Sequence, residues 1–482
     1  MLTRIVSLLC IAIQALQGIL TIKIAAQFLD ISEMKNWVLL AALIPYISIF
    51  DFGISQALIR EVSIAKKNGE IKSRDYEYTL IRTLLIFSGT VILLLAIPSF
   101  IISMIDITKI ITLTCLFIAF SCLRIFSNII LALVFVNISA LVERTIRLFS
   151  SLIFLSSIYA FLYLQFNIYS LHLAVLSQSI VIIFLSCFII RIDLYQIWHH
   201  HYDRKIIKKV FPNLRDWTLT YIPSLFVFSS TIYIISLTLT AEDVVKYSII
   251  YQLFFGVLAV CNIPVQLNSP KWSQNFVRDG AGSFNKAIMN VIFEVSIIAI
   301  MGCLFLSAFG NQIIHFIKPS ISTIGFMSFL LFSLLIYIES IQATLTSACF
   351  SCRETNYIKI TVIAGICSVL FSFLGAKLYG LEGAIGGVLL SQSITCEIFN
   401  IKRALSFFNF NKWFVLKLFP LGGGVIFVSS LLFIVMNNSG YETISLTNIY
   451  YKILTICVLV LIYIVTSYFS GLYSLGKKHH ES

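Results

Sequence analysis

The sequence predicts an all-α polytopic membrane protein with about fourteen transmembrane helices. Of its 482 residues, 59% are hydrophobic and only 12% are charged, and the mean hydropathy is +0.95. A soluble domain usually has about a quarter of its residues charged, and a water-soluble fold could not bury so much apolar surface. The apolar residues also occur in runs of about 20, the length that a helix needs to cross the hydrocarbon core.

Six apolar runs precede the longest basic stretch of the chain. The first begins after Arg4 and exceeds the apolar core of a signal peptide, which is about 7–15 residues long. Gln14 and Gln17 also interrupt this run, so we interpret it as an uncleaved first span. The six predicted spans cover residues 5–28, 36–54, 78–104, 110–136, 148–165 and 168–190.

Eight further apolar runs follow the basic stretch, and polar or basic residues separate each from the next. They predict spans at residues 217–240, 246–269, 286–309, 323–349, 360–378, 383–401, 415–436 and 447–473. We expect the last two to form an appendage, because they fall outside the internal repeat described below.

The distribution of basic residues predicts the orientation of the spans. Lys and Arg of short loops collect on the cytoplasmic side of a membrane protein. With the N-terminus inside, most of the 34 Lys and Arg residues fall in cytoplasmic loops, and both termini are cytoplasmic. We therefore expect a multi-pass protein of the bacterial inner membrane. The net charge of +12 is explained by these loops rather than by nucleic-acid binding, which would require a basic patch on a soluble module.

An internal repeat predicts two similar halves. The stretch LSQSI occurs at residues 176–180 and again at 390–394, and the basic loops after spans two and eight match at a similar offset. Since the offset comprises six spans, an even number, the halves run parallel to each other. The predicted divisions are an N-terminal six-helix lobe (1–191), a basic cytoplasmic interlobe loop (192–216), a C-terminal six-helix lobe (217–403) and two additional helices with a short basic tail (404–482).

The motifs of soluble enzymes are missing from the sequence. It contains no Gly-rich phosphate loop followed by Lys and Ser, no H-E-x-x-H and no nucleophile elbow. Cys349 and Cys352 form a lone C-x-x-C, and the 11 Cys residues are scattered mostly inside apolar runs as packing thiols. We therefore expect no catalytic activity, no metal and no cofactor.

Two cations inside predicted spans are candidates for substrate binding. Arg124 lies near the middle of the fourth span, and Ser121, Ser127 and Asn128 lie three or four residues from it on one helix face. An ionisable residue at this depth faces a cavity or a partner. A structural ion pair between helices is the alternative for Arg124, and for Lys23, nearer the end of its span, the alternative is snorkelling to the interface.

Three acids inside predicted spans are candidates for proton coupling. Glu294 lies in span nine, Glu339 in span ten and Glu397 in span twelve, each with polar residues on the same helix face. A buried carboxylate can take up and release a proton during transport. The alternative for each is a neutral or paired structural acid.

Four stretches resemble bacterial polysaccharide exporters of the multidrug/oligosaccharidyl-lipid/polysaccharide superfamily, whose nearest branch is the Wzx-type O-antigen flippases. FDFGISQALIREVSIAKKNGE (50–70) is similar to the D-x-G and basic loop that end span two, and VVKYSIIYQL (244–253) to the V-G-x-Y of span eight. LYGLEGAIGGVLLSQSI (378–394) resembles the Gly/Ala-rich entry to span twelve, and CFSCRETNYIKI (349–360) the basic loop after span ten. Lys246 stands where the family has Gly.

The resemblance implies a MATE-like, V-shaped fold of two lobes with alternating access. It also implies a flippase that moves an undecaprenyl-diphosphate-linked oligosaccharide, such as an O-antigen repeat unit, from the cytoplasmic to the periplasmic leaflet, as an ion-coupled antiporter in lipopolysaccharide biosynthesis. Membrane lipids, the polysaccharide polymerase and the chain-length regulator are then the expected partners. Residues expected at the cytoplasmic entrance for the diphosphate are Asp51, Arg60, Arg144, Arg147, Lys271 and Arg353.

Two alternatives stay open at this point. A MATE-like multidrug or cation efflux transporter would favour acids in the cavity over a central Arg, and commonly has twelve spans. A membrane glycan polymerase or ligase would act on the same lipid-linked substrate, but such enzymes usually carry one long extracytoplasmic loop, whereas every predicted outer loop here is short.

Overall fold

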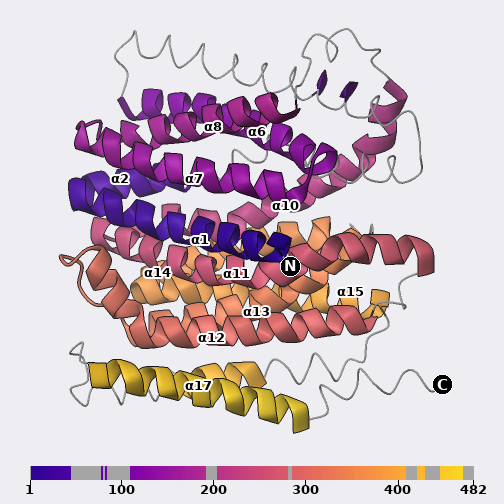
Figure 1. The fold of residues 1–482 in the computed structure, drawn as a ribbon. Helices are drawn as coiled ribbons and strands as arrows, with labels where there is room; N and C mark the ends of the chain where they lie inside the picture. The colour runs from indigo at the N-terminus through magenta and orange to yellow at the C-terminus, as the bar shows by residue number, and fades with distance from the viewer. Residues whose placement is uncertain are drawn as a thin grey trace. The chain divides into compact units, whose positions relative to one another are not determined.

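The helices of the computed structural model confirm the all-α fold class (Figure 1). The structure describes residues 2–44, 78–79, 82–83, 109–190, 204–279, 285–352, 354, 357–408, 421–428 and 446–469. Within these ranges every regular element is helical. The chain divides into two compact units, Met1–Leu225 and Phe226–Ser482.

The first unit contains five labelled helices and the first part of a sixth; the bounds of α1, α6 and α8 follow the predicted spans closely, whereas α2 and α7 begin before theirs. Helix α8 packs against both α6 and α7, and α1 packs against α7. A small buried cluster of Leu131, Val134, Ile146 and Ile182 joins α6, α7 and α8. These helices are α1 (Leu2–Phe28), α2 (Ile31–Ala41), α6 (Lys109–Asn137), α7 (Ala140–Tyr163) and α8 (Tyr169–Ile190).

Capping residues define where two of these helices begin. Asp30 caps α2 in a capping box, in which the Glu33 backbone N–H donates to Asp30 Oδ1 at 2.6 Å. Ser139 caps α7 by accepting a hydrogen bond from the Val142 N–H at 3.2 Å. Asn167 Nδ2 also donates to Glu33 Oε1 at 3.1 Å, so the α1–α2 and α7–α8 turns lie together at one end of the unit.

The second unit is built around α13, which packs against α11, α12, α14 and α15. Phe254 of α11 stacks on Phe332 of α13 with ring centroids 5.2 Å apart. Helix α17 packs on α12, where the buried Lys452 Nζ donates to the Ala308 carbonyl at 3.0 Å. The bounds are α11 (Ala241–Asp279), α12 (Asn285–Ile317), α13 (Phe326–Ser351), α14 (Ile358–Gln392), η2 (Ser393–Glu397), α15 (Ile398–Phe408) and α17 (Leu446–Phe469), and α10 (Arg204–Thr238) continues from the first unit into the second.

Helix α14 is a hairpin of two helical arms, which correspond to the predicted spans at 360–378 and 383–401. The helical dihedral angles break at Tyr379 and at Gly380, whose φ is 64°. Only glycine adopts such a backbone readily. On either side of this turn the two arms approach so closely that a Cβ on Gly375 would lie 2.1 Å from the Gly383 carbonyl oxygen.

The two units share features that the internal repeat predicts. The α7–α8 turn of the first unit contains two residues with positive φ, Gln165 (61°) and Asn167 (44°). The offset of the two LSQSI stretches aligns this turn in sequence with Gly380 of the second unit. The repeat also aligns α1 with α10, and α7 with the first arm of α14. Helix α1 packs on α7 in the first unit. In the second unit the corresponding helices are in contact, because Ser368 Oγ of α14 donates to the Val227 carbonyl of α10 at 2.9 Å.

Several helices extend beyond the predicted spans. Helix α10 begins at Arg204, inside the stretch expected to be the interlobe loop, and α11 continues to Asp279. Hydropathy marks only the part of a helix that lies in hydrocarbon, whereas a polar or basic continuation can stay helical outside it. Six described helices are long and apolar enough to cross a membrane, and shorter apolar helices lie at 123–137, 225–238 and 452–466. The predicted spans at 36–54, 78–104 and 415–436 lie partly or mostly outside the described residues, so the count of fourteen stays a prediction.

Candidate functional site

The first unit places Arg124 on α6 beside the N-terminal part of α7. Its side chain is half-buried, and its charge lies close enough to Arg147 of α7 for the two to interact. Ser127 Oγ donates to the Arg124 carbonyl at 2.7 Å, so this hydroxyl is engaged by its own helix. Asn128 is half-buried on the same helix, whereas the Ser121 side chain lies outside what the structure describes.

Glu143 connects the two arginines of α7. It lies in the first turn of α7, its side chain is only 5% exposed, and it forms an i,i+4 ion pair with Arg147. Its other carboxylate oxygen lies 3.4 Å from Arg144 Nε. Sequence analysis did not single out Glu143, although its spacing of four residues from Arg147 is the spacing of a helical ion pair.

The four residues Arg124, Glu143, Arg144 and Arg147 form what we call the arginine cluster. From the helix rise, Arg147 lies about 10 Å from the start of α7, and Arg124 lies about 20 Å from the end of α6. Because α6 and α7 are joined by a short turn, the cluster extends from one end of the unit into its apolar interior. Arg124 and Arg147 hold like charges close together, and Arg144 has a further interaction besides that with Glu143. Guanidinium groups gathered in this way favour an anionic ligand.

The other predicted cations do not join this cluster within the described residues. Lys23 is half-buried on α1 and already has an interaction, and Lys271 is exposed near the end of α11. Asp51, Arg60 and Arg353 lie outside the described residues.

The second unit brings two of the three predicted acids together. Glu339 of α13 and Glu397 of η2 lie close enough for their charges to interact. Glu397 is buried and Glu339 is half-buried, and each has one buried carboxylate oxygen without a hydrogen-bond partner among the described residues. Glu294 is exposed on α12 and does not belong to this pair.

The loop after α13 contrasts with the arginine cluster, because here a cation is matched by an acid. Arg403 of α15 donates to Glu354 Oε1 from Nε at 3.0 Å and from Nη2 at 2.6 Å. Its guanidinium carbon also lies 5.5 Å from the centroid of the Tyr357 ring. This arginine is therefore neutralised within its own unit.

The C-x-x-C pair is packed inside the second unit. Cys349 and Cys352 are both buried, and burial raises the pKa of the Cys352 thiol, at the end of α13, to about 12. A thiol with this pKa stays protonated near neutral pH and is a poor metal ligand and nucleophile. No group of three or more His, Cys, Asp or Glu residues in the described part of the chain could hold a metal ion.

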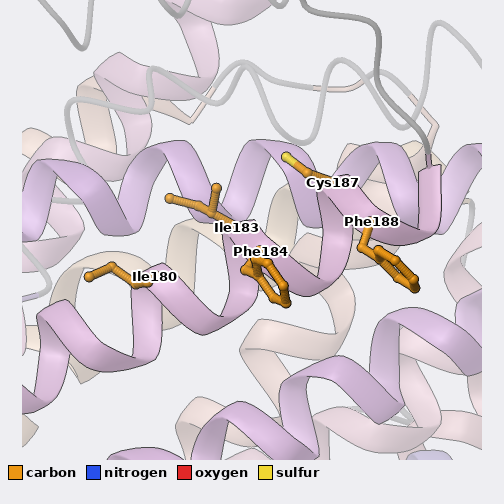
Figure 2. Close-up of a pocket in the computed structure, with 5 residues that line it drawn as sticks. All are labelled: Ile180, Ile183, Phe184, Cys187 and Phe188. Carbon is orange, nitrogen blue, oxygen red and sulfur yellow. The ribbon is translucent and has the colours of Figure 1, made fainter.

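An apolar pocket of about 420 Å³ opens on one face of α8 (Figure 2). The residues that line it are Ile180, Ile183, Phe184, Cys187 and Phe188. All five follow one another on one face of this predicted span, and Phe188 is 76% exposed. Because its lining is apolar, this pocket suits hydrocarbon rather than a charged or polar ligand.

No family model and no curated protein sequence matches this chain. Solved structures do match it. A multidrug resistance MATE family transporter of the MOP superfamily, in its inward-facing conformation, has a TM-score of 0.64 at 12% identity and covers 82% of this chain and 95% of its own. The lipid II flippase MurJ, in an inward closed conformation, has a TM-score of 0.62 at 14% identity and covers 97% of this chain and 98% of its own.

A MOP superfamily transporter from Pyrococcus furiosus, described as having a binding pocket of reversed polarity, has a TM-score of 0.63 at 12% identity and covers 83% of this chain and 94% of its own. These identities are low, so the likeness lies in the fold. The chain therefore has the MATE-like fold that these multi-pass membrane transporters share.

Proposed function

We propose that this protein is a flippase for a lipid-linked oligosaccharide with a diphosphate head group. Its cargo is an undecaprenyl-diphosphate-linked repeat unit of O-antigen or a related polysaccharide, which it moves from the cytoplasmic to the periplasmic leaflet of a bacterial inner membrane by alternating access. The observation that carries this proposal is the arginine cluster of α6 and α7, in which Arg124 and Arg147 hold like charges close together next to apolar helix surface.

The chemistry of the cluster suits a diphosphate. A guanidinium group keeps its charge in an apolar environment and presents a planar fork of donors to phosphate oxygens. Glu143 pairs with Arg147, while Arg124 and Arg147 lie close enough for their like charges to repel each other. An anion between these two guanidinium groups would relieve that repulsion, and charged groups inside a membrane protein by default serve such a partner.

The fold is consistent with this reading. The structures that match the chain over most of its length include a flippase, the MurJ protein, whose name gives lipid II as its substrate, and MATE transporters. The outer loops within the described residues are short, as between α7 and α8 and between α12 and α13, which disfavours a glycan polymerase or ligase with a long catalytic loop. In a polysaccharide system the polymerase and the chain-length regulator would be the partner proteins.

The test is binding of an undecaprenyl-diphosphate sugar to the full-length protein in lipid nanodiscs. We expect Arg124→Gln and Arg147→Gln to weaken binding about ten- to hundredfold, because a hydrogen bond to a charged group contributes about 1.5–3 kcal/mol. Arg403→Gln is the matched control, because the Arg403 side chain is 33% exposed and paired with one glutamate, as that of Arg147 is, but it does not belong to the arginine cluster.

Two outcomes would contradict the flippase proposal. One is that both cluster variants bind within about twofold of the wild type, which is less than the smallest effect expected of a charged hydrogen bond. The other is that Arg403→Gln weakens binding as much as they do. In cells, normal O-antigen display by Arg124→Gln at normal protein levels would contradict it independently.

A MATE-like efflux transporter for cationic compounds is the second candidate. The observation that favours it is the buried pair Glu339 and Glu397, which could neutralise an organic cation. Export of a cationic dye from cells that express the protein would support this candidate if Glu339→Gln abolished the export and Arg124→Gln did not.

A further inference from the structure

Exposed aromatic residues occur together at one end of the first unit, where α1 and α7 end and α8 begins. We call them the aromatic patch. Its members are Phe28, the last residue of α1, Tyr159 and Tyr163 near the end of α7, Phe166 in the turn that follows, and Tyr169, the first residue of α8. All of these side chains are exposed, and the arginine cluster does not include any of them.

Three rings of the aromatic patch pack against one another in a defined arrangement. The rings of Tyr159 and Tyr163, one helical turn apart, are nearly parallel, with an interplanar angle of 14° and centroids 6.5 Å apart. Phe28 of α1 meets Tyr159 edge-on, with centroids 5.7 Å apart. Tyr159 is nevertheless 51% exposed and Tyr163 is 69% exposed. Two packed helices therefore hold these rings in place while much of their surface stays accessible.

Carboxylate and amide groups lie beside the aromatic patch. The α1–α2 turn carries Asp30 and Glu33, and the α7–α8 turn carries Gln165 and Asn167. The hydrogen bond from Asn167 Nδ2 to Glu33 Oε1 joins the two turns. The Asp30 carboxylate is exposed and uses Oδ1 for its capping bond, so it can still accept hydrogen bonds from a ligand. Aromatic rings and planar polar groups thus lie at the same end of this unit.

The α7–α8 turn has side chains where the aligned turn of the second unit has glycine. Gln165 and Asn167 have positive φ, as Gly380 does. Glycine adopts this backbone readily, whereas residues with a side chain are uncommon in it. Such backbone conformations occur mostly at functional sites. The presence of Gln165 and Asn167 here is therefore consistent with a use for their exposed side chains.

We propose that the aromatic patch binds the pyranose rings of the oligosaccharide that the protein carries. One face of a pyranose ring presents C–H groups, which stack on the face of an aromatic ring because that face carries negative electrostatic potential. The hydroxyl groups around the sugar can donate to a carboxylate such as Asp30 and accept from an amide such as that of Gln165. The aromatic patch and its two turns offer both kinds of contact on one surface.

Membrane anchoring is the alternative role for these rings, because aromatic residues are enriched where a membrane meets water. That role requires only rings at the level of the lipid head groups. The carboxylates separate the two roles, since a lipid phosphate offers acceptors alone and cannot donate to Asp30 or Glu33, whereas sugar hydroxyls can. The polar groups beside the rings therefore favour a sugar as the ligand.

The position of the aromatic patch suits the release of the proposed cargo, and in this respect the inference rests on the proposed function. Tyr159 follows Arg147 by twelve residues on α7, which places it about 18 Å further along the helix. The orientation predicted from the basic residues puts the start of α7 on the cytoplasmic side and its end on the periplasmic side. The oligosaccharide would thus meet the aromatic patch on the side to which it is delivered.

The experiment measures binding of two free trisaccharides, maltotriose and tri-N-acetylchitotriose, to the full-length protein in nanodiscs by saturation-transfer NMR. Neither contains a lipid or a phosphate, so the arginine cluster takes no part, and failure here is distinct from failure of the flippase proposal. We expect both to bind weakly, because stacking depends on the pyranose ring rather than on one particular hydroxyl. Tyr159→Leu and Tyr163→Leu should each weaken binding about three- to tenfold, the size of a lost aromatic contact.

Two variants serve as controls. Tyr163→Phe keeps the ring and should bind the trisaccharides within about twofold of the wild type. Tyr379→Leu removes a tyrosine that is 77% exposed in the aligned turn of the second unit but has no ring partner among the described residues, so it should bind like the wild type. Arg124→Gln should also bind both sugars normally.

Three results would overturn the proposal. The first is that neither trisaccharide binds the wild type. The second is that Tyr159→Leu and Tyr163→Leu bind as tightly as the wild type, and a lowered unfolding temperature in these variants would then indicate membrane anchoring. The third is that Tyr379→Leu loses as much affinity as Tyr163→Leu. Size-exclusion profiles that match the wild type show that each variant is folded.

Discussion

Replacing Gly387 with alanine should force apart the two arms of the α14 hairpin. The added Cβ would lie 2.4 Å from the Phe371 carbonyl oxygen and 2.6 Å from the Ser372 backbone nitrogen. Both atoms belong to the backbone of the opposite arm, so no side chain can rotate away to relieve the overlap. Gly386, the preceding residue, offers a contrast, because a Cβ there would meet only Leu331 Cδ1 at 3.7 Å, which is ordinary contact.

The magnitude follows from this geometry. An ordinary contact distance of about 3.4 Å requires the arms to move apart by about 1 Å at Gly387, and overpacking of this kind typically costs about 1–3 kcal/mol. Alanine also favours a helix over glycine by about 1 kcal/mol, but this gain is common to both positions. The difference between Gly387→Ala and Gly386→Ala therefore isolates the overlap, and we expect it to be about 1–3 kcal/mol.

Thermal unfolding of the two variants in the same detergent measures this difference. We expect Gly387→Ala to unfold at a lower temperature than the wild type and Gly386→Ala at the same or a higher temperature. If Gly387→Ala unfolds at the same temperature as Gly386→Ala or above it, the close approach of the two arms is refuted.

Two further predictions concern the loop that follows α13. A double-mutant cycle on Glu354→Gln and Arg403→Gln should give a coupling energy of about 1 kcal/mol in unfolding experiments, since the pair is partly exposed. An additive result would contradict a stabilising contribution of this ion pair. The pKa of Cys352 near 12 predicts that at pH 8 maleimide labels this thiol much more slowly in the folded protein than in the unfolded protein, where the ordinary pKa of about 8.5 gives a far larger thiolate fraction. Mass spectrometry of the labelled peptide measures both rates, and equally fast labelling of the folded protein would contradict the prediction.

The helical fold could be predicted because its signal is local. The span predicted at 110–136 coincides with α6 (Lys109–Asn137), and the span at 168–190 with α8 (Tyr169–Ile190). Boundaries were less predictable where a helix leaves the apolar region. Helix α10 begins at Arg204, within a basic stretch that hydropathy assigns to a loop, because hydropathy records the environment of a segment rather than its backbone conformation.

The candidate sites could be predicted only in part. The sequence singled out Arg124, Glu339 and Glu397 because ionisable residues are rare in apolar segments, whereas Arg147 was expected only at the cytoplasmic entrance that the resemblance implies. It could not show that Glu143 links Arg144 to Arg147, because an acid beside basic residues near a loop is also what an ordinary solvated surface contains. The π-helical turn at 393–397 was likewise hidden, since its sequence, SITCE, carries no signal that separates it from an α-helix.

The sequence by itself determined that this is a polytopic helical membrane protein and which charged residues lie within its apolar segments, and its short repeats predict two related halves. These properties follow from composition, from the length of apolar runs and from short repeated stretches, all of which are local in the chain. Only the tertiary structure decided which charges meet. Glu339 and Glu397 come together because α13 packs against η2 and α15, whereas Glu294 is exposed on α12. The rotation and pairing of helices depend on contacts between residues far apart in the sequence, and hydropathy does not record them.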